Sequence, residues 1–321
     1  MDDFTLPDRN DETVRSVAAD GSDASSAEPP RTDADIPAYL DALGIPGLAD
    51  IHIHFLPPNV LDKVWAYFDA AESSYGYPWP IHYRYDTETR LDIVRDLGVR
   101  AIPALTYPHK PGMAAWLNEW NREFAAAHDD VIHCATLYAE PESADYVPEA
   151  LAAGARLFKV HIQVGGFSPD DHVLDRAWAA LAEAQVPIVI HAGSEPLPGT
   201  YTGPQAVAKV LERFPSLQFV IAHMGMPEYD AFADLAENYS GVHLDTTMYV
   251  SGFFSSPAEV DPAYRQRLAG LQDKIILGSD FPNIPYPYAD QISGLAGLGL
   301  GDDWMRSVLW HNGARVLGLE G

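Results

Sequence analysis

Apolar residues gather along this chain in short, nearly continuous runs, and most runs are separated by stretches with the spacing of amphipathic helices. Runs without polar alternation are typical of parallel strands that are covered on both faces. The predicted strands are 47–55, 99–107, 131–138, 155–164, 186–191, 217–223, 241–247 and 274–279, and the predicted helices include 112–127, 172–185, 204–214 and 229–239. Eight strands alternating with helices predict an α/β fold, a closed (β/α)8 or TIM barrel. A doubly wound open sheet is the alternative, but no Gly-x-Gly-x-x-Gly follows the first predicted strand.

The first 34 residues do not share this pattern. They are rich in acids, and residues 18–30 are almost all small, polar or proline, so they have little apolar surface to bury. We therefore predict a disordered acidic tail over residues 1–34 and one barrel domain over residues 35–321. A tail that serves as a binding arm is the alternative interpretation.

Composition narrows the class of protein. With 47% hydrophobic residues among 321, the chain can bury the core of one large barrel. No stretch reaches the roughly eighteen apolar residues of a membrane span, and the N-terminus lacks the regions of a secretory signal. Cys134 is the single cysteine, which excludes a disulfide within the chain. The net charge of −26 argues against a nucleic-acid partner. We expect a cytoplasmic protein with no membrane partner and a small-molecule substrate.

Histidines and one aspartate stand where several apolar runs end. His52 and His54 close the first predicted strand, and their alternate spacing places both imidazoles on one face, where they can bind a divalent cation. His191 ends the fifth strand, His223 ends the sixth, and Asp280 follows the eighth. In a (β/α)8 barrel the carboxyl ends of the strands form one active-site mouth, so these side chains are predicted to converge.

Several short motifs carry a family resemblance. They are Asp50-x-His52-x-His54-x-x-Pro57, Lys159-x-His161, Ile190-His191, Ala222-His223-x-Gly225 and Gly278-Ser279-Asp280-Phe281-Pro282. In their order and strand positions, from about residue 36 to residue 319, they resemble the amidohydrolase superfamily. The chain looks most like its amidohydrolase-related group, which includes the aminocarboxymuconate-semialdehyde decarboxylase type and related decarboxylases and hydrolases.

The resemblance implies that His52, His54, His191 and Asp280 bind one divalent ion. Such a mixed nitrogen and oxygen site suits Zn²⁺ and accepts Mn²⁺, Fe²⁺ or Co²⁺. It also implies that His223 lies near the metal. Asp280 and His223 are the predicted catalytic residues, because Asp280 could take a proton from metal-bound water and His223 could polarise the substrate or move a proton.

Lys159 and His161 have two interpretations each. Some relatives carboxylate a lysine of the fourth strand to bridge two metals, whereas an unmodified Lys159 would pair with an acid or bind a substrate carboxylate. His161 is a pocket residue or a metal neighbour. The long connection over residues 56–98 is dense in aromatics, and we expect Trp79 to stack on a planar substrate and Arg84 to bind a carboxylate. Alternatively, this segment is a subunit contact of a homodimer.

Two enzymatic functions fit these residues. The first is a metal-dependent hydrolase in which metal-activated water attacks an amide, ester or lactone carbonyl. The alternative is a metal-dependent, non-oxidative decarboxylase of an aromatic or unsaturated carboxylate. A non-catalytic binding barrel would have no need for three histidines and an acid at one mouth.

Overall fold

The structure, a computed structural model, describes residues 27–319. Its strands are β1 (Ile102–Pro103), β2 (Val131–Ile132), β3 (Cys134–Thr136), β4 (Leu157–His161), β5 (Pro187–His191), β6 (Gln218–Ile221), β7 (Val242–Asp245) and β8 (Ile275–Ile276). Its α-helices are α1 (Ile36–Leu43), α2 (Pro58–Asp69), α3 (Ala71–Tyr75), α4 (Thr87–Asp96), α5 (Ala114–Ala127), α6 (Ser143–Ala152), α7 (Ile162–Gly165), α8 (Asp175–Ala184), α9 (Pro204–Arg213), α10 (Tyr229–Asn238), α11 (Pro262–Gly270), α12 (Tyr288–Ala296), α13 (Asp302–Arg306) and α14 (Asn312–Leu317). The remaining turns are η1 (Asp33–Asp35), η2 (His172–Leu174), η3 (Ala222–Gly225), η4 (Pro257–Glu259), η5 (Gln272–Lys274) and the π-helical η6 (Ser307–His311).

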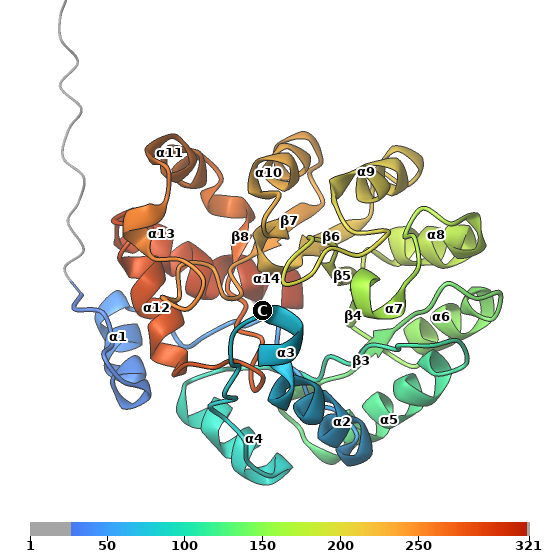
Figure 1. The fold of residues 1–321 in the computed structure, drawn as a ribbon, viewed down its shortest axis with the longest axis horizontal. Coiled ribbons are helices and arrows are strands. Elements are labelled where there is room, and N and C mark those ends of the chain that lie inside the picture. The colour runs from blue at the N-terminus through green and yellow to red at the C-terminus, as the bar shows by residue number, and fades with distance from the viewer. Residues whose placement is uncertain (1–26, 320–321) are drawn as a thin grey trace, which may run out of the picture.

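The strands form a ring with helices outside it, which confirms the predicted (β/α)8 barrel (Figure 1). Strands β3 to β8 pair in parallel in their sequence order, and β1 pairs in parallel with β2. The predicted helices 112–127, 172–185, 204–214 and 229–239 correspond to α5, α8, α9 and α10. Among the helices of residues 27–319, none is both long and apolar enough to cross a membrane.

The first predicted strand, residues 47–55, closes the ring without forming a regular strand. Its Leu48 bridges to Val99 on one side, and Ile53 bridges to Phe281 on the other. The regular ladder is interrupted because the amide of His52 donates to a side chain, the Asp50 carboxylate, at 2.9 Å. This segment therefore holds its two histidines between the first and last strands of the barrel.

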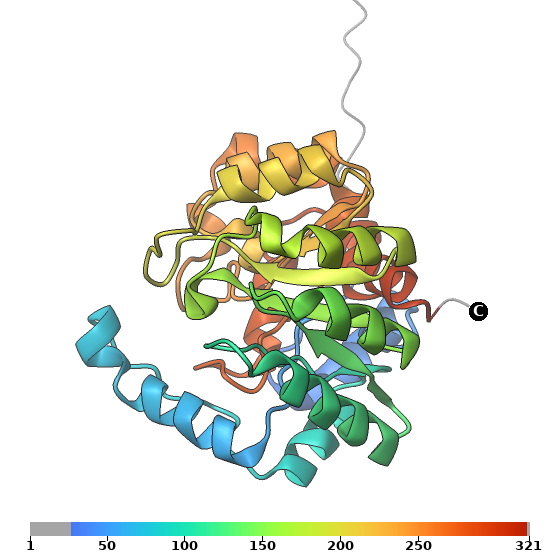
Figure 2. The ribbon, with the colours of Figure 1, turned by 90° about the vertical axis from the view of Figure 1, so that its right-hand side faces the viewer.

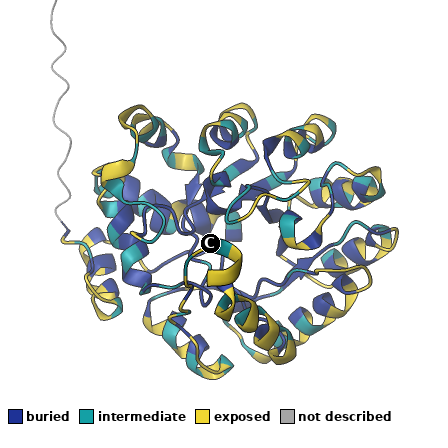
Figure 3. Cartoon of the chain, in the orientation of Figure 1, coloured by how far each residue is buried: buried dark blue, intermediate teal, exposed yellow. Residues whose placement is uncertain are grey.

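Alternation along the strands fills the barrel interior. Leu157 of β4 and Val189 of β5 belong to a compact apolar cluster that also contains Ile51, Val220 and Ile276. Two residues further along β4 and β5, the inward positions are polar, Lys159 and His191, because side chains of a strand alternate between faces. Outward residues pack under the helices, whose far faces are exposed (Figure 3). The interior thus changes from apolar to polar at the carboxyl ends of the strands.

Part of the predicted tail contacts the barrel. The Asp33 carboxylate accepts hydrogen bonds from the amide of Ala289 at 2.9 Å and from the hydroxyl of Tyr83. The hydroxyl of Ser293 donates to the carbonyl of Pro30. Residues 27–34 are therefore ordered against α12, which corrects the predicted boundary. The rest of the predicted tail, residues 1–26, lies outside the described residues.

The long connection after residue 55 contains α2, α3 and α4 rather than a loop. Helices α2 and α3 extend from one end of the barrel (Figure 2), and in Figure 1 they lie in front of the ring. In the same connection, Trp79 stacks on Phe68 of α2 and contacts Phe253 and Phe254. The aromatic residues of this connection thus form one wall over the barrel mouth. Its role as a subunit contact of a homodimer stays a prediction.

Candidate metal centre

The structure brings His52, His54 and Asp280 together at the carboxyl ends of the barrel strands. The Nε2 atom of His54 lies 2.9 Å from the Asp280 carboxylate, and Nε2 of His52 lies 3.6 Å from the same oxygen. One ligand atom from each residue falls within 4.8 Å of the others, and both histidines are buried. We call these three residues the ligand triad.

The hydrogen bonds of His54 show why a cation fits the ligand triad. Its Nδ1 lies 3.0 Å from the carbonyl oxygen of Leu105. A carbonyl oxygen only accepts, so Nδ1 carries a proton, and Nε2 is the nitrogen that faces the Asp280 carboxylate. Without a metal, a proton on Nε2 can join this nitrogen to the carboxylate oxygen, and a divalent cation can take the place of that proton. A divalent cation placed between two such donors satisfies both of them.

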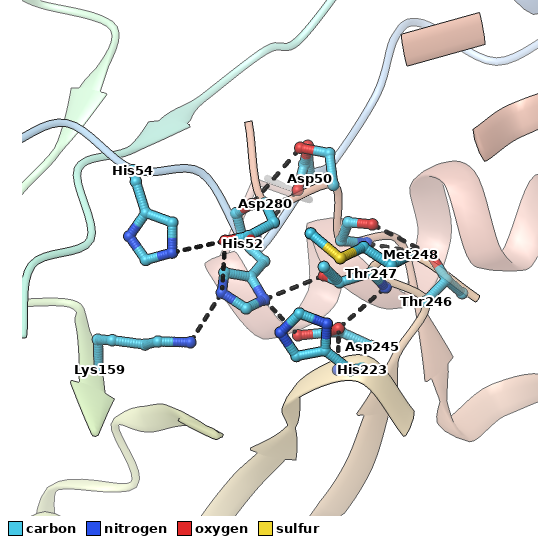
Figure 4. Close-up of polar contacts among 12 residues, drawn as sticks. Asp50, His52, His54, Lys159, His223, Asp245, Thr246, Thr247, Met248 and Asp280 are labelled. Carbon is cyan, nitrogen blue, oxygen red and sulfur yellow. Dashed lines mark hydrogen bonds and ion pairs between the residues drawn. The ribbon is translucent and has the colours of Figure 1, made fainter. Parts of the chain in front are cut away.

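His52 has the same orientation, fixed by a residue that sequence reasoning missed. Its Nδ1 lies 2.9 Å from the buried carboxylate of Asp245 and 3.0 Å from the Thr247 hydroxyl (Figure 4). The other Asp245 oxygen accepts the backbone amide of His223 at 2.9 Å. Asp245 ends β7 as His191 ends β5, so the position of a carboxylate at a strand end was the signal that could have found it.

The charges around Asp245 and Asp280 keep both carboxylates ionised. Burial works to raise the pKa of Asp280, yet the hydrogen bond and charge of His54 hold that pKa below its usual range. Burial likewise opposes ionisation of Asp245, but the charge and hydrogen bond of His52, together with the charges of His223 and Lys159, lower the pKa of Asp245. The centre therefore offers a fixed negative charge to a cation.

Backbone strain is concentrated at the same place. Asp280 has a φ of 66° and His223 has a φ of 55°, values that residues other than glycine rarely adopt. The amide of Asp280 donates to the carbonyl of His52 at 2.8 Å, which holds its side chain over the ligand triad. Such strain persists only where surrounding contacts enforce it, and it is typical of functional sites.

Asp50 supports the backbone that carries the two histidines. In addition to the His52 amide, it accepts the Tyr288 hydroxyl at 2.7 Å. Burial raises the pKa of Asp50 to about 7. Asp50 therefore holds the backbone of this segment in place through hydrogen bonds, and it does not line the cavity.

His191 and His161 lie beside the ligand triad but outside it. Their rings stack with centroids 4.1 Å apart, and His191 also contacts the ring of His223 at 4.7 Å. Nε2 of His191 faces the carbonyl of Glu195 at 3.1 Å, which leaves its Nδ1 with a lone pair. His161 has the opposite tautomer, because its Nδ1 accepts the amide of Val164 at 3.3 Å. His191 can thus provide a ligand nitrogen, whereas His161 offers an N–H.

His223 completes the group of polar residues at the mouth. Its ring lies 5.4 Å from that of His52, centroid to centroid, and burial lowers its pKa to about 4. The ring is therefore neutral near pH 7. Within residues 27–319, its buried Nδ1 has no hydrogen-bond partner. An unpaired buried nitrogen of this kind is available to a ligand.

Lys159 lies at the floor of the mouth. Its Nζ is 2.7 Å from Nε2 of His52, and the side chain is fully buried (Figure 4). Burial lowers the pKa of this amine to about 8. The amine donates to the lone pair that the ligand triad would offer to a cation, so Lys159 and the ion would compete for His52.

A cavity of about 830 Å³ opens above these residues. Trp79 lines its wall and donates its indole N–H to the carbonyl of Asn283 at 2.7 Å, and its stacking on a substrate stays a prediction. Arg84 does not line it. Instead, its guanidinium pairs with Asp69 at 2.8 Å and lies over the ring of Trp65. A contact of Arg84 with a substrate carboxylate stays a prediction.

The fold and the ligand triad together define a metal-dependent enzyme of the (β/α)8 class. The family model described as amidohydrolase matches residues 49–319, so the chain belongs to the amidohydrolase family. No curated protein matches its sequence.

Three solved structures are similar to the fold. An uncharacterised TIM-barrel protein from Bordetella bronchiseptica has a TM-score of 0.66 and 18% identity, covering 83% of this chain and 97% of its own. A 5-carboxyvanillate decarboxylase from Novosphingobium aromaticivorans, complexed with manganese and 4-hydroxy-3-methoxy-5-nitrobenzoic acid, has a TM-score of 0.56 and 14% identity, covering 84% and 96%. A 2,6-dihydroxybenzoate decarboxylase, complexed with 2,6-dihydroxybenzoate, has a TM-score of 0.55 and 17% identity, covering 85% and 99%.

Proposed function

We propose that the protein is a divalent-metal-dependent hydrolase that cleaves an amide, an ester or a lactone. The observation that carries this proposal is the convergence of Nε2 of His52, Nε2 of His54 and the ionised carboxylate of Asp280 at the mouth of the barrel. His191 completes the metal ligands through its Nδ1. Zn²⁺ suits three nitrogens and one oxygen best, and Mn²⁺, Fe²⁺ or Co²⁺ also fit such a site.

The residues around the ligand triad have distinct roles in this reaction. A divalent ion held by the ligand triad would polarise a carbonyl and acidify water. Asp280 is ionised and accepts the proton of the attacking water. The neutral ring of His223 polarises the carbonyl oxygen or passes a proton to the leaving group. His161 donates its Nε2–H to the substrate, because its Nδ1 is already used.

Decarboxylation is the second candidate, because solved structures similar to the fold include a 5-carboxyvanillate decarboxylase and a 2,6-dihydroxybenzoate decarboxylase. In that reaction the same ligands would hold a carboxylated ring, and a proton donor at the mouth would protonate the carbon that loses carbon dioxide. A panel of amides, esters, lactones and aromatic carboxylates separates the two functions. Hydrolysis yields the acid and the leaving group, whereas decarboxylation releases carbon dioxide.

The metal content tests the ligand set. We expect close to one divalent ion per chain after expression with Zn²⁺ or Mn²⁺, and His52→Ala or His191→Ala should lose most of it. Protein without metal under these conditions would refute the proposal. Two ions per chain, one of which is lost in Lys159→Ala, would instead support a carboxylated Lys159.

Variants of Asp280 and His223 test the mechanism on the same preparations. Asp280→Asn keeps the shape but removes the charge and the basicity, so turnover should fall by orders of magnitude while metal content falls only in part. His223→Ala should keep the ion and lose roughly 10²- to 10⁴-fold in rate, the usual range for general acid–base catalysis. Loss of the ion in His223→Ala would make His223 a ligand. A near-normal rate in Asp280→Asn would remove it as the proton acceptor.

A further inference from the structure

Lysines are rare in this chain, and they gather at the cavity. The sequence has five lysines in a protein of net charge −26. Three of the five line the same cavity, Lys63, Lys110 and Lys159, whereas no arginine of residues 27–319 does so. A random distribution of lysines over the surface would not place most of them around one opening. The cavity therefore differs in charge from the rest of the molecule.

Two of these lysines stand at the exposed rim without a counter-charge. Lys63 lies on α2 and Lys110 in the loop after β1, and both are exposed. Neither has an ion pair or a hydrogen bond within the described part of the chain, whereas Lys209 pairs with Asp170 at 3.1 Å. A cation that no carboxylate neutralises leaves its charge available to a ligand.

The two rim lysines line the cavity together with His109. Burial lowers the pKa of His109, and the positive charges of Lys110 and Lys63 add to this effect. The carboxylates that line the cavity among residues 27–319 are Asp280, at the ligand triad, and Glu195. The charge of the rim formed by Lys63 and Lys110 is therefore positive.

The cavity connects this rim to the ligand triad. His52 and Lys159 at its floor are buried, while Lys63 and Lys110 at its rim are exposed, and aromatic side chains including Trp79 line the wall between them. A volume of about 830 Å³ is within the range of sites that enclose a small organic ligand. A substrate with its reacting group at the floor would extend along the aromatic wall to the lysines.

We propose that Lys63 and Lys110 form an anion-binding end of the substrate site, so that the substrate carries an anionic group at the end remote from its reacting group. This inference rests on the proposed function for the position of the reacting group. A lysine is a point charge without the fork geometry of arginine, so it selects charge rather than a planar carboxylate shape. Phosphonate analogues of the same length separate two kinds of site. A general anion site should bind the phosphonate as well as the carboxylate, whereas a site too small for a phosphonate should bind only the carboxylate.

Matched pairs of probes test the proposal without knowledge of the substrate. The probes are isophthalate, naphthalene-2,6-dicarboxylate and biphenyl-4,4′-dicarboxylate, each compared with its monomethyl ester by isothermal titration calorimetry on metal-loaded enzyme. For the dicarboxylate of matching length, we expect about fivefold to tenfold tighter binding than for its ester, the scale of two exposed ion pairs. High salt should reduce this preference.

Variants assign the preference to the rim. Lys63→Met with Lys110→Met should abolish the difference between dicarboxylate and ester, and Lys63→Arg with Lys110→Arg should retain it. Lys209→Met, the matched control on the outer surface, should leave it unchanged. An equal preference in wild type and the double Met variant would overturn the proposal, as would a wild type that prefers none of the dicarboxylates.

Repeating the titrations on metal-free protein separates this inference from the proposed function. If the chain binds no metal, the proposed function fails, yet the dependence of dicarboxylate binding on Lys63 and Lys110 is still measured. If metal binds and the dependence is missing, only the anion-binding end is refuted.

Discussion

At the scale of single residues, the candidate centre depends on side chains that never face the substrate. Asp245 accepts one hydrogen bond from the ring of His52 and another from the backbone of His223. These bonds fix the tautomer of His52 and the position of the strained His223 residue. Such partners of a metal-binding histidine influence metal affinity strongly. Asp245 is therefore a positioning residue for both.

Replacing Asp245 with asparagine should weaken the metal site while leaving its ligands in place. An amide nitrogen would face one of the two donors, so either the His52 ring or the His223 backbone loses its acceptor. We expect metal affinity to fall roughly 10- to 100-fold, measured by competition with a chelator of known affinity. Asp234→Asn, an exposed partner of Arg267, is the matched control. An unchanged metal affinity in Asp245→Asn would show that the carboxylate has no such role.

At the scale of elements, the sequence was sufficient to predict the barrel, but not the irregular first strand or the connection that follows it. Continuous apolar runs predicted β4 to β7 and their helices, because burial on both faces leaves a strong pattern. The first strand was predicted as regular, whereas Asp50 takes the amide of His52 and breaks the ladder. Polar residues at strand ends identified the ligand triad. The sequence pattern did not predict the partner of Arg84. That partner, Asp69, lies at the end of α2, a helix within the connection that was predicted only as a long loop.

The N-terminal segment allows a test at the same scale. Residues 27–34 make contacts of Asp33 and Pro30 with the barrel, whereas the composition of residues 1–26 offers little to bury. Deleting residues 1–26 should leave the melting temperature within about 1 °C of wild type. Deleting residues 1–34 should lower it by roughly 2–6 °C, because the loss of three part-buried hydrogen bonds costs about 1–2 kcal/mol in a domain of this size.

Differential scanning calorimetry of the two truncations measures this difference. Asp33→Ala in the full chain is the matched control, and we expect it to reproduce most of the larger loss. Equal melting temperatures for both truncations would show that the contacts of residues 27–34 add no net stability. A large loss on deleting residues 1–26 would instead reveal a structural role for that segment.

At the scale of the whole molecule, the net charge of −26 sets a balance between solubility and stability. Like charges spread over the helices repel one another and disfavour the compact state, although they keep the chain soluble. Most of the ion pairs in the described part are exposed, and exposed pairs contribute little each. Salt screens both the repulsion between like charges and the attraction within ion pairs. Because the repulsion is the larger effect in this protein, added salt should stabilise it.

Raising NaCl from roughly 0.05 M to roughly 1 M, which shortens the screening length from over ten to about 3 Å, should raise the melting temperature. A variant with Glu149→Gln, Glu183→Gln and Glu212→Gln removes three exposed charges that have no ion pair in residues 27–319, so its melting temperature should rise less with salt. Glu→Asp at the same three positions keeps the charge and should retain the response of the wild type. Melting temperatures that stay constant or fall with salt in the wild type would show that attraction between charged groups, not repulsion, dominates the surface.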